Sequence, residues 1–325
     1  MYEHHYFVLV EKESVVVKKK KGIKQKSMSK QILKYRNYYI MLLPGLIFVI
    51  LFLYLPIFYN FIAFKDYKIF LGPLGSPWCG LKNFTKLFRT PDFMRILKNT
   101  FALCFLKILI GFPIPIILAL LINEVKNIMF KKTIQTIVYL PHFISWVIIA
   151  TIASTLLSPS DGVINLLLNK LGINSIFFIG DSRYFRGVLV ATDIWKEMGW
   201  SAIIYLAALS GVPLDLYEAA TVDGANKLQK MKYVTFPCIL PTIIIMLLLR
   251  IGNILNSNFE QVFTMYNSSV YDVADIIDTY VYRVGIIQTQ YGFSASAGLF
   301  KSIISLVLVV TCNWLTKKAG QESLF

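Results

Sequence analysis

Charged residues and the residues of common catalytic and metal sites are scarce in this chain. Only 16% of its 325 residues are charged, whereas a soluble globular protein carries about 25%. It has three histidines and four cysteines, with no C-x-x-C pair and no Cys/His spacing suited to zinc. These shortages exclude an ordinary soluble enzyme, and they predict that the chain holds no metal site.

Sequence motifs for energy conversion and catalysis are also missing. No G-x-x-x-x-G-K-[ST] phosphate loop occurs, so we do not expect the chain to bind ATP in the usual way. No Ser/His/Asp triad or pair of carboxylates stands in a soluble domain, and no segment outside the apolar runs is large enough to capture a solute. We therefore expect no catalytic residue and no cofactor in this chain, with energy and solute capture supplied by partner chains.

Apolar residues, by contrast, make up 56% of the chain, and the mean hydropathy is +0.60. A helix that crosses the bilayer needs roughly 20 apolar residues. Six runs of about this length or longer occur, at residues 38–64, 100–123, 134–157, 187–210, 238–258 and 297–315. The pattern predicts an all-α integral membrane protein with six transmembrane helices.

Basic residues set the expected orientation. Lys and Arg number 33 against 18 Asp and Glu, and ten of them lie in residues 1–37. The positive-inside rule predicts a cytoplasmic basic tail at 1–37, then a six-span domain at 38–325 with both termini in the cytoplasm. Residues 65–99 argue against this orientation, because they carry seven Lys/Arg on the expected outer side. Met28 is a second candidate start, which would leave residues 1–27 out of the native product.

The outer loop also contains apolar residues at helical spacing. Residues 83–88, followed by Phe93 and Ile96, place these apolar positions between charges. The pattern fits either a short amphipathic helix in the outer interface or a solvated loop.

The segment at residues 212–241, between the fourth and fifth apolar runs, is the most informative. Asp215 is a good N-cap, and Glu218 three residues later completes a capping-box-like start. Gly224 is a natural helix stop in the left-handed conformation, and a second short helix is expected at 226–233, ending before the next proline. We therefore expect a helix–turn–helix elbow on the cytoplasmic side, whose small residues can enter a groove on a partner.

This elbow resembles the EAA loop of binding-protein-dependent ABC importer permeases. The family pattern is Glu-Ala-Ala, two positions, Asp-Gly-Ala, and then, nine positions after the Gly, Ile-x-Leu-Pro. The matching residues here are Glu218, Ala219, Ala220, Asp223, Gly224, Ala225 and Pro237. Val234 and Phe236 stand where the family has Ile and Leu, and both keep the apolar character.

The resemblance extends beyond the elbow and covers residues 35–325. Residues 193–209 are similar to the sugar-transporting, MalF-like permeases of this family. Residues 258–263, 275–283 and 298–302 are similar to its LplB/YteP branch, which is linked to complex polysaccharides and their oligosaccharides. The resemblance implies the type I ABC importer permease fold, with residues 38–325 as the permease domain.

The resemblance also implies a function and a set of partners. The chain would be the transmembrane permease subunit of an ATP-driven importer for sugars, specifically complex oligosaccharides, in the bacterial cytoplasmic membrane. A second six-span permease, two ABC ATPase subunits that bind ATP and Mg, and a lipid-anchored or periplasmic sugar-binding protein would complete it. Glu218 would meet a basic residue of the ATPase, and Gly224 would let the elbow helices pack. The chain would contact sugar and membrane lipid, and no nucleic acid.

Charged residues within the spans need an explanation, because each costs about 2.5–3.5 kcal/mol on insertion. Asp193, Lys196 and Glu197 share one helical face, and Arg250 is expected to pair with Asp193 or Glu197. Two interpretations stay open: an internal ion pair between the fourth and fifth spans, or a lining of the transport path. Two other cations in the spans are expected only to extend to the membrane interface: Lys107 and Lys301.

Candidates for the sugar path combine aromatic faces, which stack on sugar rings, with amides and carboxylates, which bind hydroxyl groups. They are Trp195, Glu197, Trp200, Tyr205, Asn253, Asn256, Asn258 and Glu260. For the aromatic residues, a belt at the membrane interface is the alternative.

Two other classes of membrane protein compete with the importer. An ion-coupled secondary transporter predicts inverted repeats and discontinuous helices, which the sequence does not display, and would leave the elbow unexplained. An integral membrane enzyme predicts catalytic groups clustered at an interface, and no such cluster is visible.

Overall fold

The computed structural model describes residues 34–256, 258–318 and 320. Most of the predicted basic tail and the alternative start at Met28 lie outside the described residues. Within these residues the secondary structure is helical, and the only extended pairing is an isolated bridge between Lys65 and Trp78. The chain divides into two units, residues 1–58 and 59–325, and each is described by itself.

The described part of the first unit belongs to one apolar helix, which runs from Arg36 to Phe64. Its pieces are α2 (Arg36–Val49), a π-helical turn η1 (Ile50–Tyr54) and α3 (Leu55–Tyr59), continued by the 3₁₀ segment η2 (Asn60–Phe64) of the second unit. None of the side chains of α2, η1 or α3 is buried. This helix covers the first predicted span.

The other predicted spans are helices of the second unit. Pro91–Glu124 comprises α6 (Pro91–Leu106), η4 (Lys107–Gly111) and α7 (Pro113–Glu124). Lys227–Ile254 comprises α13 (Lys227–Lys230), η6 (Met231–Thr235) and α14 (Phe236–Ile254), and α18 is Tyr291–Lys318. Two pairs are bent: α8 (Ile128–Tyr139) with η5 (Leu140–Phe143) meets α9 (Trp146–Leu156) at 105°, and α11 (Ser182–Ser210) meets α12 (Leu214–Val222) at 69°.

Among the described residues, four helices are long and apolar enough to cross a membrane, and the count reaches six if each bent pair is one span. Short helices connect them: η3 (Ile69–Leu71), α4 (Gly72–Gly75), α5 (Lys82–Arg89), α10 (Val163–Lys170), α15 (Phe259–Met265), η7 (Ser268–Val270), α16 (Tyr271–Ala274), α17 (Ile277–Tyr282) and η8 (Arg283–Ile287). The predicted number of spans therefore agrees with the structure.

Three prolines of the long helices follow π-helical turns. Pro56, Pro113 and Pro237 each stand two residues after such a turn, η1, η4 and η6 respectively. In an ordinary α-helix the proline ring would collide with the carbonyl four residues earlier, and the wider π turn relieves this collision. The prediction that the second elbow helix ends before Pro237 is therefore wrong: α13, η6 and α14 form one continuous helix.

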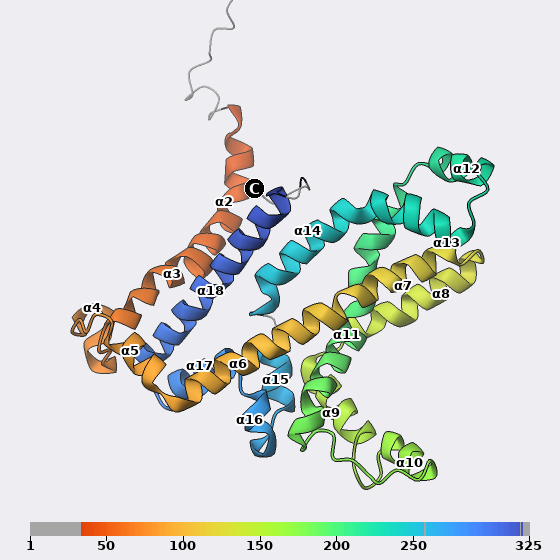
Figure 1. Cartoon of the computed structure of the whole chain (residues 1–325). Coiled ribbons are helices and arrows are strands. Elements are labelled where there is room, and N and C mark those ends of the chain that lie inside the picture. The colour runs from red at the N-terminus through yellow and green to blue at the C-terminus, as the bar shows by residue number, and fades with distance from the viewer. Residues whose placement is uncertain (1–33, 257, 319, 321–325) are drawn as a thin grey trace, which may run out of the picture. The chain divides into compact units, whose positions relative to one another are not determined.

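Helix α11 is the element around which the second unit packs, and it crosses α7 and α8 (Figure 1). Asp181 caps its N-terminus by accepting a hydrogen bond from the Arg183 amide, and the Arg183 side chain lowers the pKa of this carboxyl. Towards its C-terminus, α11 shares an apolar cluster with α7 and α14, which contains Ile116, Ala119, Ala202, Tyr205, Leu209, Ile239 and Ile243. We call this the elbow-side cluster.

The outer loop contains the short helix that the spacing of its apolar residues predicted, α5 (Lys82–Arg89), so the solvated-loop alternative is wrong. Helix α5 buries Leu87, which packs with Phe93 and Ile96 of α6 and with Phe293 of α18. The apolar residues that suggested an interfacial helix thus contact protein, because α18 covers them.

Candidate transport path and coupling elbow

The turn of the elbow is a Schellman motif at the end of α12. Gly224 has φ +76°, its N–H donates to the Thr221 carbonyl at 3.0 Å, and the Ala225 N–H donates to the Ala220 carbonyl at 2.9 Å. The predicted left-handed stop at Gly224 is confirmed. A Cβ at Gly224 would have no heavy atom within 4 Å, so the expectation that this glycine permits close helix packing is wrong. Its conformation alone requires glycine.

The predicted N-cap of the first elbow helix is wrong. Helix α12 begins at Leu214 with Pro213 in the N-cap position, so Asp215 lies inside the first turn and makes no capping hydrogen bond. Pro213 holds a non-helical conformation directly before the helix and starts it two residues early. The capping box forms instead at α13, where Asn226 and Gln229 bond each other's backbone N–H groups at 2.9 and 2.8 Å.

Side-chain hydrogen bonds fasten α12 to the helix that follows it. The Tyr217 hydroxyl lies 2.9 Å from Thr235 Oγ1, and Lys230 Nζ donates to Thr221 Oγ1 at 2.7 Å. The Tyr217 ring also packs against the elbow-side cluster. These contacts connect α12 to the packed ends of α7, α11 and α14.

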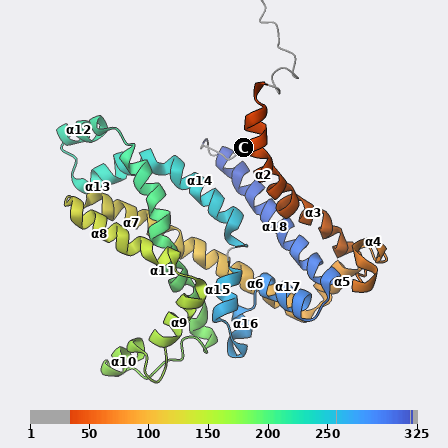
Figure 2. The same ribbon diagram turned by 180° about the vertical axis from the view of Figure 1, so that it is seen from behind.

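The outward face of the elbow is exposed. Figures 1 and 2 show α12 projecting from the end of the bundle at which α7 meets α8. Neither α12 nor α13 contains a buried residue, and Glu218 is exposed without an ion-pair partner in the described part of the chain. Large apolar side chains are exposed as well: Leu214, Val222 and Leu228 are 73%, 88% and 75% accessible. Such a surface suits a protein partner.

A second polar constellation lies inside the bundle, centred on Lys107. This side chain is completely buried, and its Nζ donates to Asp193 Oδ1 at 2.8 Å, Asn258 Oδ1 at 2.7 Å and Gln261 Oε1 at 2.6 Å. Gln261 in turn donates through Nε2 to Thr192 Oγ1 at 2.8 Å. We call this group of five residues the buried polar centre. It joins η4, α11 and the start of α15, and each charge has a bonded partner.

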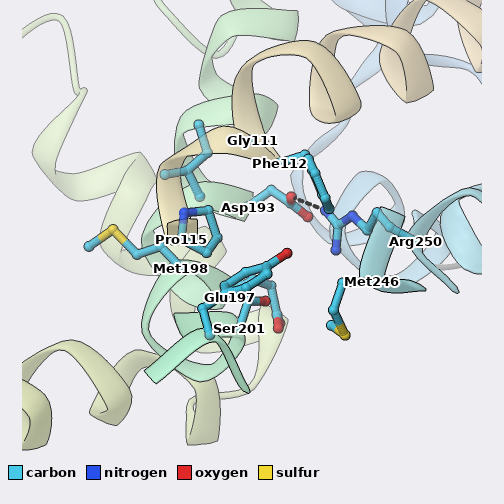
Figure 3. A pocket seen from close by; sticks show the side chains of 11 residues that line it. Gly111, Phe112, Pro115, Asp193, Glu197, Met198, Ser201, Met246 and Arg250 are labelled. Carbon is cyan, nitrogen blue, oxygen red and sulfur yellow. Dashed lines mark hydrogen bonds and ion pairs between the residues drawn. The ribbon is translucent and has the colours of Figure 1, made fainter. Parts of the chain in front are cut away.

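Asp193 also binds a second cation, across a small cavity. Arg250 Nη2 reaches from α14 and donates to Asp193 Oδ2 at 2.8 Å (Figure 3). The expected ion pair between the fourth and fifth spans is therefore present. The cavity of about 40 Å³ beside it is lined by both residues and by Glu197, Met246 and Tyr205 among others. One carboxylate thus holds three helical segments together.

The other charges of this face of α11 bind the break in the third span. Lys196 Nζ donates to the carbonyls of His142 and Ile144 at 2.6 and 2.5 Å. These residues lie at the bend before α9, where backbone carbonyls have no partner within a helix. Glu197 Oε2 lies 3.1 Å from His142 Nδ1, and the His142 ring stacks on Trp200 at 4.5 Å. These contacts fix the bend.

Comparison with protein families identifies the chain. The family model described as "Binding-protein-dependent transport system inner membrane component" matches residues 111–320, which include the elbow and most of the buried polar centre. The chain belongs to this family. It is therefore a non-catalytic, membrane-embedded permease component of a transporter that works with a substrate-binding protein. Because the chain belongs to this family, the two alternatives, an ion-coupled secondary transporter and an integral membrane enzyme, are not supported.

Relatives within the family match nearly the whole chain. The polygalacturonan/rhamnogalacturonan transport system permease protein YteP of Bacillus subtilis is 44% identical over 313 residues, 96% of this chain and 97% of its own. Protein LplB of the same organism is 47% identical over 287 residues, 88% of this chain and 90% of its own. The resemblance to the LplB/YteP branch is thus confirmed.

Solved structures of the family share the fold. The crystal structure of a bacterial ABC transporter involved in import of the acidic polysaccharide alginate has a chain 41% identical to this one, with a TM-score of 0.83 over 89% of this chain and 98% of its own. A second structure, with the alginate pentasaccharide-bound periplasmic protein, gives 0.85 at 40% identity over 91% and 99%. The chain has the type I ABC importer permease fold.

The structure distributes the predicted sugar-path residues of this permease among several environments. Tyr205 lies in the elbow-side cluster, 1% exposed, and Asn258 is in the buried polar centre. Trp195 and Trp200 are 38% and 44% exposed. Glu197 contacts His142 at the bend of the third span. The last three residues are exposed near the end of α14 and the start of α15: Asn253, Asn256 and Glu260. The eight residues therefore do not form one site in this chain.

The expectation that Lys107 has no role beyond reaching the membrane interface is wrong. Lys107 lies 16 residues after Pro91 and 17 before Glu124, too far from either helix end for its stem to reach the interface. The predicted span began at residue 100, which placed Lys107 only seven residues from its start. The helix in fact begins nine residues earlier, at Pro91, and this puts Lys107 in its middle. Lys301 was misjudged likewise, since its ammonium binds Asp278 of α17.

Proposed function

We propose that this permease imports carbohydrate oligomers. The relatives support this substrate class: YteP is named for polygalacturonan and rhamnogalacturonan, and the solved transporter takes up alginate. A third relative, AraP of Halalkalibacterium halodurans, is named for arabinooligosaccharides and is 32% identical over 77% of this chain. In this proposal the chain forms one half of the translocation path, and a second six-span permease forms the other half.

The exposure of the elbow supports a mechanism in which it contacts the ATPase. In our proposal α12 inserts into a groove on one of two ABC ATPase subunits, which bind the ATP and Mg. Glu218 meets a basic residue there, and Ala219 and Ala220 allow close approach because they add little bulk. The Asp223-Gly224-Ala225 turn sets the angle between α12 and α13, and Pro237 lies in the first turn of α14. Closure of the ATPase dimer then moves α12 as a rigid body.

The elbow-side cluster connects this motion to the path. Tyr217 packs on it from α12, and the cluster joins the cytoplasmic ends of three long helices. Densely packed side chains transmit displacement because they cannot be compressed. The same side of the membrane then holds the elbow, the ends of α7 and α8, and both chain termini.

Sugar contacts in this proposal come from the outer half of the bundle. A hollow of about 430 Å³ lies between the start of α15, α17 and α18, with Asn256, Tyr282 and Tyr291 on its wall together with Asp278 and Lys301. Aromatic faces beside amides and charges suit a sugar, which has apolar ring faces and hydroxyl edges. In this proposal Trp195, Glu197 and Trp200, which are at least partly exposed, contribute where the second permease completes the path.

Reconstitution tests the proposal. The chain purified alone is expected to hydrolyse no ATP, and with its second permease, ATPases and binding protein in vesicles it is expected to take up an oligosaccharide at the expense of ATP. ATP hydrolysis should rise when the binding protein is loaded with sugar. Robust hydrolysis by the chain alone, or sugar uptake without ATPase subunits, would contradict the proposal.

A further inference from the structure

A basic hollow lies where the first turns of α6 and α11 meet. It has a volume of about 550 Å³ and is lined by Arg95, Lys98, Asn99 and Arg186 together with apolar atoms. Three of the lining residues are cations and none is a carboxylate. Arg95 and Lys98 belong to the seven Lys/Arg of residues 65–99 that run against the positive-inside rule. Neither the elbow nor the buried polar centre uses Arg95 or Lys98.

The hollow has a surplus of positive charge. Arg95 Nη2 pairs with Asp92 at 2.8 Å, but both side chains are largely exposed. Within the described part of the chain, Arg186 bonds only neutral groups: Nη2 donates to Asn99 Oδ1 at 2.7 Å and Nε to the Val273 carbonyl at 3.2 Å. Lys98 is exposed and has no hydrogen-bond or ion-pair partner within residues 34–256 and 258–318. Two cations therefore lack a counter-charge.

Hydrogen bonds hold Arg186 in a fixed position. Asn99 is 3% exposed, and its Nδ2 donates to the carbonyls of Asp272 and Asp275 at 2.9 and 3.1 Å, which fixes the amide whose oxygen binds Arg186. A guanidinium has five N–H donors, and these contacts use two of them. The fixed fork that remains suits a carboxylate.

The hollow and the elbow lie at opposite ends of α11. Arg186 is in its second turn, and α12 follows its last residue, Ser210. At about 1.5 Å per residue, the intervening helix spans roughly 36 Å, more than the hydrocarbon thickness of a bilayer, about 30 Å. With the elbow on the ATPase side, the hollow faces the side from which the sugar arrives.

We propose that this hollow binds a carboxylate of an acidic oligosaccharide, a chain that contains uronate units, as it enters the transporter. The inference rests on the proposed import of carbohydrate oligomers and adds the charge of the substrate and its first contact residues. The volume lies within the range of about 300–1,000 Å³ typical of small-molecule sites. A concave site of this size fits a solute better than a docked protein, whose interface is broad and buries about 800 Å² per partner.

Transport assays on the reconstituted importer test this site with trigalacturonate as the substrate. Lys98→Gln is expected to lower maximal uptake and stimulated ATP hydrolysis at saturating loaded binding protein, by about tenfold, the effect of one charge-assisted hydrogen bond. Lys98→Arg should retain most of the activity, because the charge remains. The matched control Lys170→Gln removes an exposed lysine at the end of α10 and should change nothing.

Three results would overturn the site. Wild-type uptake by Lys98→Gln would show that Lys98 contacts no carboxylate, which contradicts the site as proposed. An unchanged maximal rate reached only at higher concentrations of binding protein would show that Lys98 docks that protein instead. A loss that Lys98→Arg does not restore would show a structural role. Failure of the proposed function itself would appear differently, as wild-type protein that no sugar-loaded binding protein stimulates.

Discussion

The elbow and the buried polar centre both depend on polar residues, yet the two regions are built in opposite ways. The elbow is contiguous in sequence, exposed, and held by bonds between residues fewer than 20 positions apart, such as Tyr217 with Thr235. The buried polar centre joins Lys107 to Asp193 and Gln261, which are 86 and 154 positions away, and excludes solvent. The polar residues of the elbow are accessible to a partner, whereas those of the buried polar centre bond one another inside the fold.

The largest effect should come from breaking the interior region. Asp193→Leu removes the carboxylate that binds both Lys107 and Arg250, and leaves a fully buried ammonium without a counter-charge. Loss of one partner of a buried pair typically costs about 3–5 kcal/mol of unfolding free energy. Denaturant or thermal unfolding of the purified chain in detergent measures it. Glu218→Ala on the elbow is the matched control and should change stability by less than about 0.5 kcal/mol.

A second substitution sharpens this test. Because the destabilisation comes from an unpaired charge, adding Lys107→Met to Asp193→Leu should recover part of the lost stability. A double variant less stable than Asp193→Leu alone would show that Lys107 stabilises the fold independently of Asp193.

The next largest effect concerns the contact between α11 and α8. A Cβ added at Gly199 would lie 1.9 Å from the Val138 carbonyl oxygen, so Gly199→Ala must push the two helices apart. Overpacking of this kind lowers the unfolding free energy by about 1–3 kcal/mol, which is measured as a lower unfolding midpoint. Gly187→Ala is the control on the same helix, since its Cβ would meet nothing within 4 Å, and helix propensity favours alanine there by about 1 kcal/mol. Equal stabilities of the two variants would contradict the contact.

The smallest effect on stability is expected at the elbow turn. Gly224→Ala places a Cβ in the left-handed conformation at φ +76° without a steric clash, at a cost of about 1–2 kcal/mol. In the reconstituted importer, uptake and stimulated ATP hydrolysis should fall together, because the angle between α12 and α13 changes. Gly224→Asn should retain more activity, since asparagine tolerates this conformation. Equal losses in both variants would show that the side chain, not the backbone, disturbs docking.

The same contrast explains which parts of the structure the sequence could predict. The spans and the elbow are indicated by local patterns: long apolar runs, Glu218-Ala219-Ala220, and a glycine that can stop a helix. The start of α12 was missed because Pro213 outweighs Asp215, and the continuity past Pro237 was missed because a π turn leaves no local sequence signal. Lys107 and Gln261 were missed as partners, since only the packing of η4, α11 and α15 brings them together.

Glu218 provides the most direct test of the central claim, that the elbow couples ATP hydrolysis to transport. Glu218→Lys reverses the charge of an exposed side chain while leaving the fold intact. In vesicles containing the complete importer, we expect sugar-stimulated ATP hydrolysis and sugar uptake to fall together, several-fold or more, while the binding protein's affinity for sugar is unchanged. Full stimulated hydrolysis with full uptake, or a changed choice of sugar at an unchanged rate, would contradict the account.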